Sequence, residues 1–147
     1  MKIIKLIIII NLLCYGCQNP NSERKIAEFK KSFISDKNLS LVIKDCRSSL
    51  DAKDSHKKIV FELQELVKNS NITRGRALTK DNLFTIFLIN DLVRFRLEIN
   101  STIDGKTFVN FFQHVKNNYY SFKGRVYITE NECIKLKDLI SNYCCLE

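Results

Sequence analysis

The chain has 147 residues, enough for one domain of ordinary size with its own hydrophobic core. Its residues are 45% hydrophobic and 27% charged, a composition that excludes a disordered or fibrous protein. The formal net charge is +8, from 24 basic and 16 acidic residues. Charge of this sign favours anionic sugars, anionic lipid or an acidic protein face as partners, but it is equally typical of a solvated surface rich in lysine.

The first part of the chain, residues 1–16, has the layout of a secretory signal peptide. Lys2 and Lys5 give it a positive start, and residues 6–13 form an apolar run that only Asn11 interrupts. A permanent membrane-spanning helix needs about 20 apolar residues, so this run is too short to remain in a membrane. We therefore expect residues 1–16 to be removed during export, which places the rest of the chain outside the cytoplasm.

Two processing reactions fit the residues at the end of this leader. Cys14 and Gly16 are small residues at the two positions that a general signal peptidase reads. A lipoprotein peptidase instead requires an apolar residue, small residues and then a cysteine, and the segment 13–17 (LCYGC) has that outline. Together with the polar residues 18–22, this segment resembles the start of small outer-surface lipoproteins of spirochaetes. The resemblance covers residues 1–22 only.

Besides the single helical domain that apolar spacing predicts over residues 23–147, this resemblance implies a lipid on Cys17 and a tether over residues 17–22. It also implies attachment to the outer membrane or the cell surface, whereas the other processing route gives a secreted protein. The number of cysteines beyond the leader is odd. Lipidation of Cys17 leaves an even number that can pair in an oxidising compartment, and without it one thiol is left over or pairs between chains.

The disulfide candidates are Cys46, Cys133, Cys144 and Cys145. Cys133 and Cys144 lie 11 residues apart, or about 16 Å along one helix, so they cannot pair while that helix is intact. A bridge between Cys46 and Cys133 would join the two ends of the domain. The pair 144–145 can instead send one thiol to Cys46 or to another chain.

The mature chain begins with apolar residues at helical spacing. Residues 22–34 and residues 55–68 each place their apolar side chains on one face, which predicts two amphipathic helices. Between them, residues 39–50 follow the same spacing even more closely. Ser35 or Asp36 can cap a helix there by accepting its free backbone N–H groups. We therefore expect three consecutive helices.

The central segment 79–99 is the densest in apolar residues, so we expect it to form the centre of the core. Asp91, Arg94 and Glu98 recur at i, i+3 and i+7, which favours a helix that exposes a charged stripe. Residues 93–99, however, alternate between apolar and polar, which is typical of a strand. We prefer the helical interpretation and keep the strand as its alternative.

The C-terminal part begins with a predicted turn at residues 104–105. Residues 108–122 then place aromatic side chains at helical spacing, which predicts a long helix whose rings belong to the core. The alternative is a short hairpin in which residues 119–122 pair with residues 125–128 across Lys123-Gly124.

A last helix is predicted from a capping box at Thr129 and Glu132 to about Tyr143. Together these elements predict a mainly α protein, an antiparallel bundle of five or six helices with room for one short β-hairpin near the C-terminal end.

The polar residues form no pattern typical of catalysis or metal binding. The sequence has no phosphate-binding glycine loop, nucleophile elbow or His-Glu metal motif. His56 and His114 lack the spacing to cysteine that a zinc site shows. We therefore expect no enzymatic activity, no cofactor and no metal.

The loop 69–80 concentrates positive charge in Arg74, Arg76 and Lys80. Loops on protein surfaces commonly carry binding residues, so these three are the candidate contacts for an anionic partner. The preferred function is an exported, lipid-anchored protein of the surface or envelope that binds a partner without catalysis. Besides the membrane, that partner is a host or envelope protein or an anionic polysaccharide, and no nucleic acid is expected.

The alternative function is a soluble secreted ligand that resembles four-helix cytokines, from a eukaryote or a virus. Glycosylation sequons at Asn38, Asn71 and Asn100 fit this alternative. Sugar on these residues, or acyl mass on Cys17, would distinguish the two hypotheses.

Overall fold

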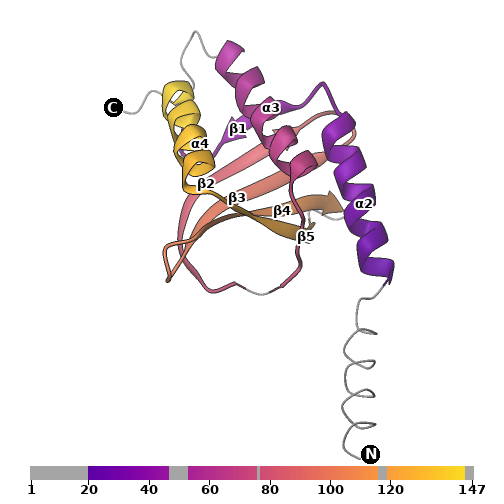
Figure 1. Cartoon of the computed structure of the whole chain (residues 1–147). Helices are drawn as coiled ribbons and strands as arrows, with labels where there is room; N and C mark the ends of the chain where they lie inside the picture. The colour runs from indigo at the N-terminus through magenta and orange to yellow at the C-terminus, as the bar shows by residue number, and fades with distance from the viewer. Residues whose placement is uncertain (1–19, 47–52, 76, 116–118, 145–147) are drawn as a thin grey trace, which may run out of the picture.

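The computed structural model describes residues 20–46, 53–75, 77–115 and 119–144. Within these ranges five strands form one antiparallel sheet in the order β1-β2-β3-β4-β5, and the helices lie on one side of it (Figure 1). The mainly α bundle expected from the sequence is therefore wrong, and the domain is α+β. In chain order the elements are α2 (Pro20–Ser35), β1 (Ser40–Ile43), α3 (Lys53–Asn69), β2 (Thr79–Ile89), β3 (Arg94–Thr102), β4 (Thr107–Val115), β5 (Tyr119–Ile128) and α4 (Glu130–Tyr143).

The core lies between the sheet and the helices. Phe29 and Phe33 of α2 pack against Phe95 of β3 and Phe111 of β4, with ring centroids 5.1 to 5.9 Å apart. All four rings are at most 2% exposed. Apolar side chains of α3 and α4 belong to the same buried cluster. Rings in edge-to-face contact add to the stabilisation that apolar burial alone supplies, so this group fixes α2 on the sheet.

The helices predicted over residues 22–34 and 55–68 are present as α2 and α3, and the last predicted helix is present as α4. The capping box at the start of α4 is also confirmed. The backbone N–H of Glu132 donates to Thr129 Oγ1 at 3.3 Å, and the N–H of Thr129 donates to Glu132 Oε2 at 2.7 Å. Both bonds satisfy N–H groups that the first helical turn leaves free.

Residues 79–99 form β2 and β3, so the helical interpretation of this segment is wrong and the strand alternative for residues 93–99 is correct. The two strands meet at Asn90, whose Oδ1 accepts the backbone N–H groups of Leu92 at 2.8 Å and Val93 at 2.6 Å. An asparagine side chain that binds the backbone in this way favours a turn over the continuation of a helix.

Residues 108–122 also form strands, and the predicted aromatic helix is wrong. The turn at residues 104–105 is confirmed, with Gly105 at φ 81° between β3 and β4. The short hairpin across Lys123-Gly124 is wrong as well, because both residues lie inside β5. Gly124 has φ 154° and follows the register shift that separates Phe111 from Phe112 on β4. A β-bulge, not a turn, is what this glycine permits.

The helix predicted over residues 39–50 is replaced by β1, which pairs with β2. Leu41 and Ile43 are buried while Val42 between them is 50% exposed, which is the alternation of a strand. Asp36 caps no helix there: its Oδ1 accepts the backbone N–H of Asn38 at 3.0 Å. The remainder of that predicted helix, residues 47–52, lies outside the described ranges.

A disulfide joins Cys46, just after β1, to Cys144 at the C-terminal end of α4, with a Cα–Cα distance of 5.4 Å. The sequence left Cys133, Cys144 and Cys145 open as partners of Cys46, and this pairing is one of the three. The pairing with Cys133 does not occur, since Cys133 is buried with a free thiol. Cys17 and Cys145 lie outside the described ranges.

Candidate functional site

The second face of the sheet carries no helix in the part of the chain that the structure describes. Phe95 and Leu97 belong to the helix-side core, so Arg96 between them points to the opposite side. The cross-strand register places Phe87 of β2 and Phe112 of β4 beside Arg96. We call this surface the helix-free face; it comprises Phe87, Arg96, Glu98, Phe108, Asn110, Phe112, His114, Tyr120, Phe122, Arg125 and Tyr127.

Arg96 lies at the centre of the helix-free face. Its guanidinium carbon is 4.3 Å from the ring centroid of Phe112 and 5.1 Å from that of Tyr120. Glu98 Oε1 is 3.3 Å from Arg96 Nε, an ion-pair contact that lacks hydrogen-bond geometry, and Nε is enclosed without a hydrogen-bond partner. The side chain is nevertheless 31% exposed. Stacking uses the faces of a guanidinium, so its N–H edge is left to bind an acceptor.

Arg125 lies on the neighbouring part of the same face and is 8% exposed. Its guanidinium carbon is 5.0 Å from the ring of Phe108 and 5.7 Å from that of Phe122. Nε and Nη1 have no hydrogen-bond partner, and no acidic side chain of the described residues forms an ion pair with it. Phe122 packs on Phe112 at 5.5 Å, which connects the surroundings of the two arginines. An enclosed positive charge without a counter-ion is costly, and a nearby anion would lower that cost.

Some buried side-chain nitrogen and oxygen atoms of the described residues have no hydrogen-bond partner, and all of them lie on the helix-free face. Besides the arginine nitrogens, these atoms are Asn110 Oδ1 and His114 Nε2. Asn110 stands between Glu98 and Arg125 in the cross-strand register, and His114 packs on Tyr120 at 5.4 Å. Native proteins contain few such atoms, and a cluster of them on one surface indicates a site at which a ligand or partner completes the bonding.

The basic loop predicted from the sequence is not a single cluster. Arg74 is held at the outer edge of β5, where Nη2 donates to the Phe122 carbonyl at 3.4 Å. Lys80 is exposed near the start of β2, on the far side of β3 and β4 from Arg74. Arg76 lies outside the described ranges. Of the two predicted contacts that the structure describes, it brings Arg74 and not Lys80 close to the helix-free face.

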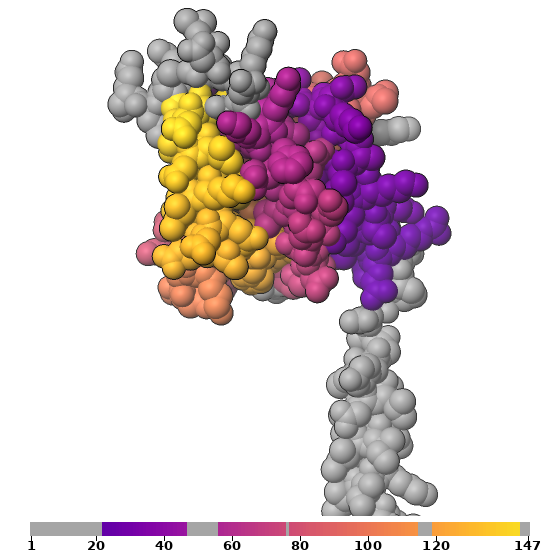
Figure 2. All heavy atoms as spheres, turned by 45° about the horizontal axis from the view of Figure 1, so that its top comes forward, coloured from indigo at the N-terminus to yellow at the C-terminus, as the bar shows by residue number. Residues whose placement is uncertain are grey.

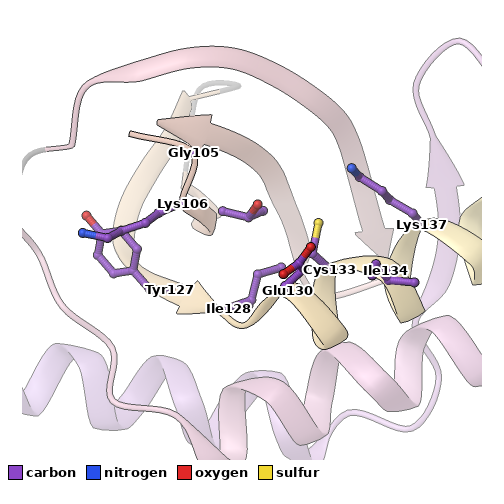
Figure 3. Close-up of a pocket in the computed structure, with 9 residues that line it drawn as sticks. Gly105, Lys106, Tyr127, Ile128, Glu130, Cys133, Ile134 and Lys137 are labelled. Carbon is purple, nitrogen blue, oxygen red and sulfur yellow. The ribbon is translucent and has the colours of Figure 1, made fainter. Parts of the chain in front are cut away.

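A second candidate site is an open pocket of about 820 Å³ beside the start of α4. In Figure 3, Glu130 and Cys133 project from α4 toward the opening, while Lys106 and Tyr127 lie on its other side. Lys106 pairs with Asp104 at 3.0 Å, which raises the pKa of Lys106. The lining includes no histidine. The lining therefore holds no Cys-His pair of the kind that activates a thiol nucleophile.

The two histidines are both distant from this thiol in the fold. His56 Nε2 is 2.9 Å from the Leu39 carbonyl at the start of α3, and His114 lies on the helix-free face. Within the described ranges, no group of three or more His, Cys, Asp or Glu side chains could hold a metal ion.

No helix of the described ranges combines the length and the apolar content that a membrane crossing requires. Comparison with models of protein families, with curated proteins and with solved structures finds no match.

Sequence reasoning missed the residues of the helix-free face. Arg96 and Arg125 lie 29 positions apart in the chain, and only the pairing of β3, β4 and β5 brings their surroundings together. The one available signal was the alternation over residues 93–99, which places Arg96 and Glu98 opposite the apolar side of a strand.

Proposed function

We propose that this protein is exported, is held at the envelope by a lipid on Cys17, and binds a protein partner through the helix-free face without catalysis. The partner presents a carboxylate that binds the partly exposed side chain of Arg96. The signal-like leader and the lipobox-like segment 13–17 support the cellular location. The chemistry of the helix-free face supports the binding role.

The observation that carries the binding role is the excess of unpaired positive charge among aromatic rings. Among the described residues, Glu98 pairs with Arg96 without a hydrogen bond to its Nε, and no carboxylate pairs with Arg125. An additional anion would complete this charge balance, and bidentate binding of a carboxylate is the interaction that arginine favours. Phe, Tyr and Arg are also the residues enriched at the centres of protein–protein interfaces, whereas lysine is depleted there.

A photo-crosslinking experiment in intact producing cells tests this proposal. Benzoylphenylalanine at Phe87, on the helix-free face, should capture a protein, and the same probe at Phe61, 58% exposed on α3, should not. Capture from Phe87 should be lost with Arg96→Met and retained with Lys58→Met, a change on exposed α3. A product sensitive to periodate but not to protease would instead identify an anionic polysaccharide and contradict the protein partner.

The location is tested separately by the intact mass of the natural mature protein. Acyl mass on Cys17 is expected. Sugar mass on the sequons would favour the secreted ligand, but the four-helix fold of that alternative is not the fold of this domain. Asn100 is moreover 3% exposed, and its Nδ2 donates to the Glu98 carbonyl at 2.9 Å, so it is not accessible for glycosylation in the folded chain.

A further inference from the structure

A second charged surface lies where the N-terminal half of α2 meets the outer edge of β5. We call it the basic cluster; it comprises Lys25, Arg74 and Lys123. Thr73 and Arg125 exchange backbone hydrogen bonds of 2.9 and 2.8 Å, which fixes Arg74 beside β5. Lys123 is the β5 residue that follows the Phe122 carbonyl bound by Arg74.

α2 contacts β5, and Arg74 bonds to β5 beside Lys123, which brings the three basic groups near one another. Partial burial lowers the pKa of the Lys123 amine, and the positive charges of Arg74 and Lys25 lower it further, while Glu28 acts in the opposite direction. Glu28 is already bound by Arg24, with Nε to Oε1 at 2.9 Å. No described acid therefore forms an ion pair with a member of the basic cluster.

The length of chain before α2 limits the distance between the basic cluster and any lipid on Cys17. α2 begins at Pro20, so the chain from Cys17 to Pro20 spans at most about 11 Å. Lys25 is a further 7 to 8 Å along the helix, by about 1.5 Å per residue. Figure 2 shows α2 exposed along one side of the molecule. The N-terminal end of α3, which carries Lys57 and Lys58, lies at the opposite end of the domain (Figure 1).

We propose that the basic cluster binds the anionic headgroups of the membrane that holds the lipid, so that the domain rests on the membrane by one defined side. This inference depends on the lipid anchor in the proposed function. Basic residues within a Debye length of an anionic surface each strengthen binding by about fivefold, and the short connection lets the domain turn so that the basic cluster comes within that range. A free amine with a lowered pKa gains further from nearby phosphate, because the anion offsets the like-charge repulsion.

The test uses the natural lipidated protein, reconstituted in neutral phosphatidylcholine vesicles and in vesicles that also contain phosphatidylglycerol. Amine acetylation at each lysine is followed by mass spectrometry. In the anionic vesicles we expect labelling of Lys25 and Lys123 to slow several-fold relative to Lys57 and Lys58, and we expect molar salt to abolish this protection. If the labelling rates of Lys25 and Lys123 relative to those of Lys57 and Lys58 are the same in both kinds of vesicle, the inference is overturned.

A variant series adds a readout that does not depend on labelling chemistry. Arg74→Gln combined with Lys25→Gln should weaken the protection of Lys123 in anionic vesicles, whereas Lys57→Gln combined with Lys58→Gln should leave it intact. Failure of the anchor has a different signature: the protein would lack acyl mass and would not remain with either vesicle. That result would overturn the proposed function and this inference together.

Discussion

The guanidinium carbon of Arg96 lies 4.3 Å from the ring centroid of Phe112, its cross-strand partner on β4. Arg125 on β5, two strands further along, repeats the arrangement against Phe108 and Phe122. Contacts with aromatic rings therefore position both guanidinium groups, whereas an ion pair with an acidic side chain is present at Arg96 alone among the described residues. Ring stacking holds the side chains in place while their N–H groups stay available, which is the preorganisation that a carboxylate-binding surface requires.

Removing the enclosed charge of Arg125 should stabilise the free domain. Arg125→Met keeps most of the packing between Phe108 and Phe122 and deletes an unpaired charge, so we expect the free energy of unfolding to rise by about 1 kcal/mol. The loss of two cation–π contacts limits the gain. Urea unfolding followed by circular dichroism measures the change. Arg94→Met, at an exposed position at the start of β3, should change stability by less than about 0.5 kcal/mol. A clear decrease in the free energy of unfolding of Arg125→Met would contradict the claim that Arg125 has no counter-ion in the free domain.

The disulfide between Cys46 and Cys144 should be a major source of stability. It closes a loop with a sequence separation of 98. In the chain-entropy model such a loop contributes about 4 to 5 kcal/mol by restricting the unfolded chain. Urea unfolding with and without reductant should show a difference of that size in the free energy of unfolding. In the Cys46→Ser variant the reductant should have no further effect, and a persisting difference would show that another disulfide contributes.

Gly124 should tolerate no side chain. A Cβ there would lie 2.2 Å from Ile72 Cγ2 and 3.0 Å from the Thr73 carbonyl oxygen. Gly124→Ala should therefore reduce the free energy of unfolding by about 2 kcal/mol or more, through overpacking and an unfavourable positive φ. Gly75→Ala is the matched control, since its Cβ would meet nothing within 4 Å. Equal stability of the two variants would disprove the close packing of the segment 70–75 against β5.

The pKa of Lys123 should respond to its neighbours. Burial and the charges of Arg74 and Lys25 lower this pKa in the folded protein. The unfolded chain then binds more protons than the folded one between the two pKa values, so the Lys123 contribution makes stability rise with pH in that window. Lys25→Gln should move the pKa of Lys123 back toward the ordinary lysine value. Carbon-detected NMR of the lysine side chain measures it, and an unchanged titration curve would remove Lys25 from the basic cluster.

The three helices could be predicted because each has one apolar face and one solvated face. The strands could not, because both faces of the sheet carry large apolar residues. Phe108 and Phe112 belong to the helix-free face while Phe111 belongs to the core, yet along the sequence they follow the spacing of one helical stripe. The apolar residues of 79–99 likewise predicted a helix, whereas the turn at Asn90 divides this segment into two strands. The rings around Arg96 and Arg125 then meet across β4 through strand register, which the sequence does not specify.

Binding to the crosslinked partner gives the most direct test of the helix-free face. The dissociation constant should rise about 30-fold or more for Arg96→Met, since loss of one side of a partly buried charge pair costs about 2 kcal/mol or more. Lys58→Met should bind as the natural protein does. If Arg96→Met and Lys58→Met bind the partner equally well, the helix-free face is not the binding surface.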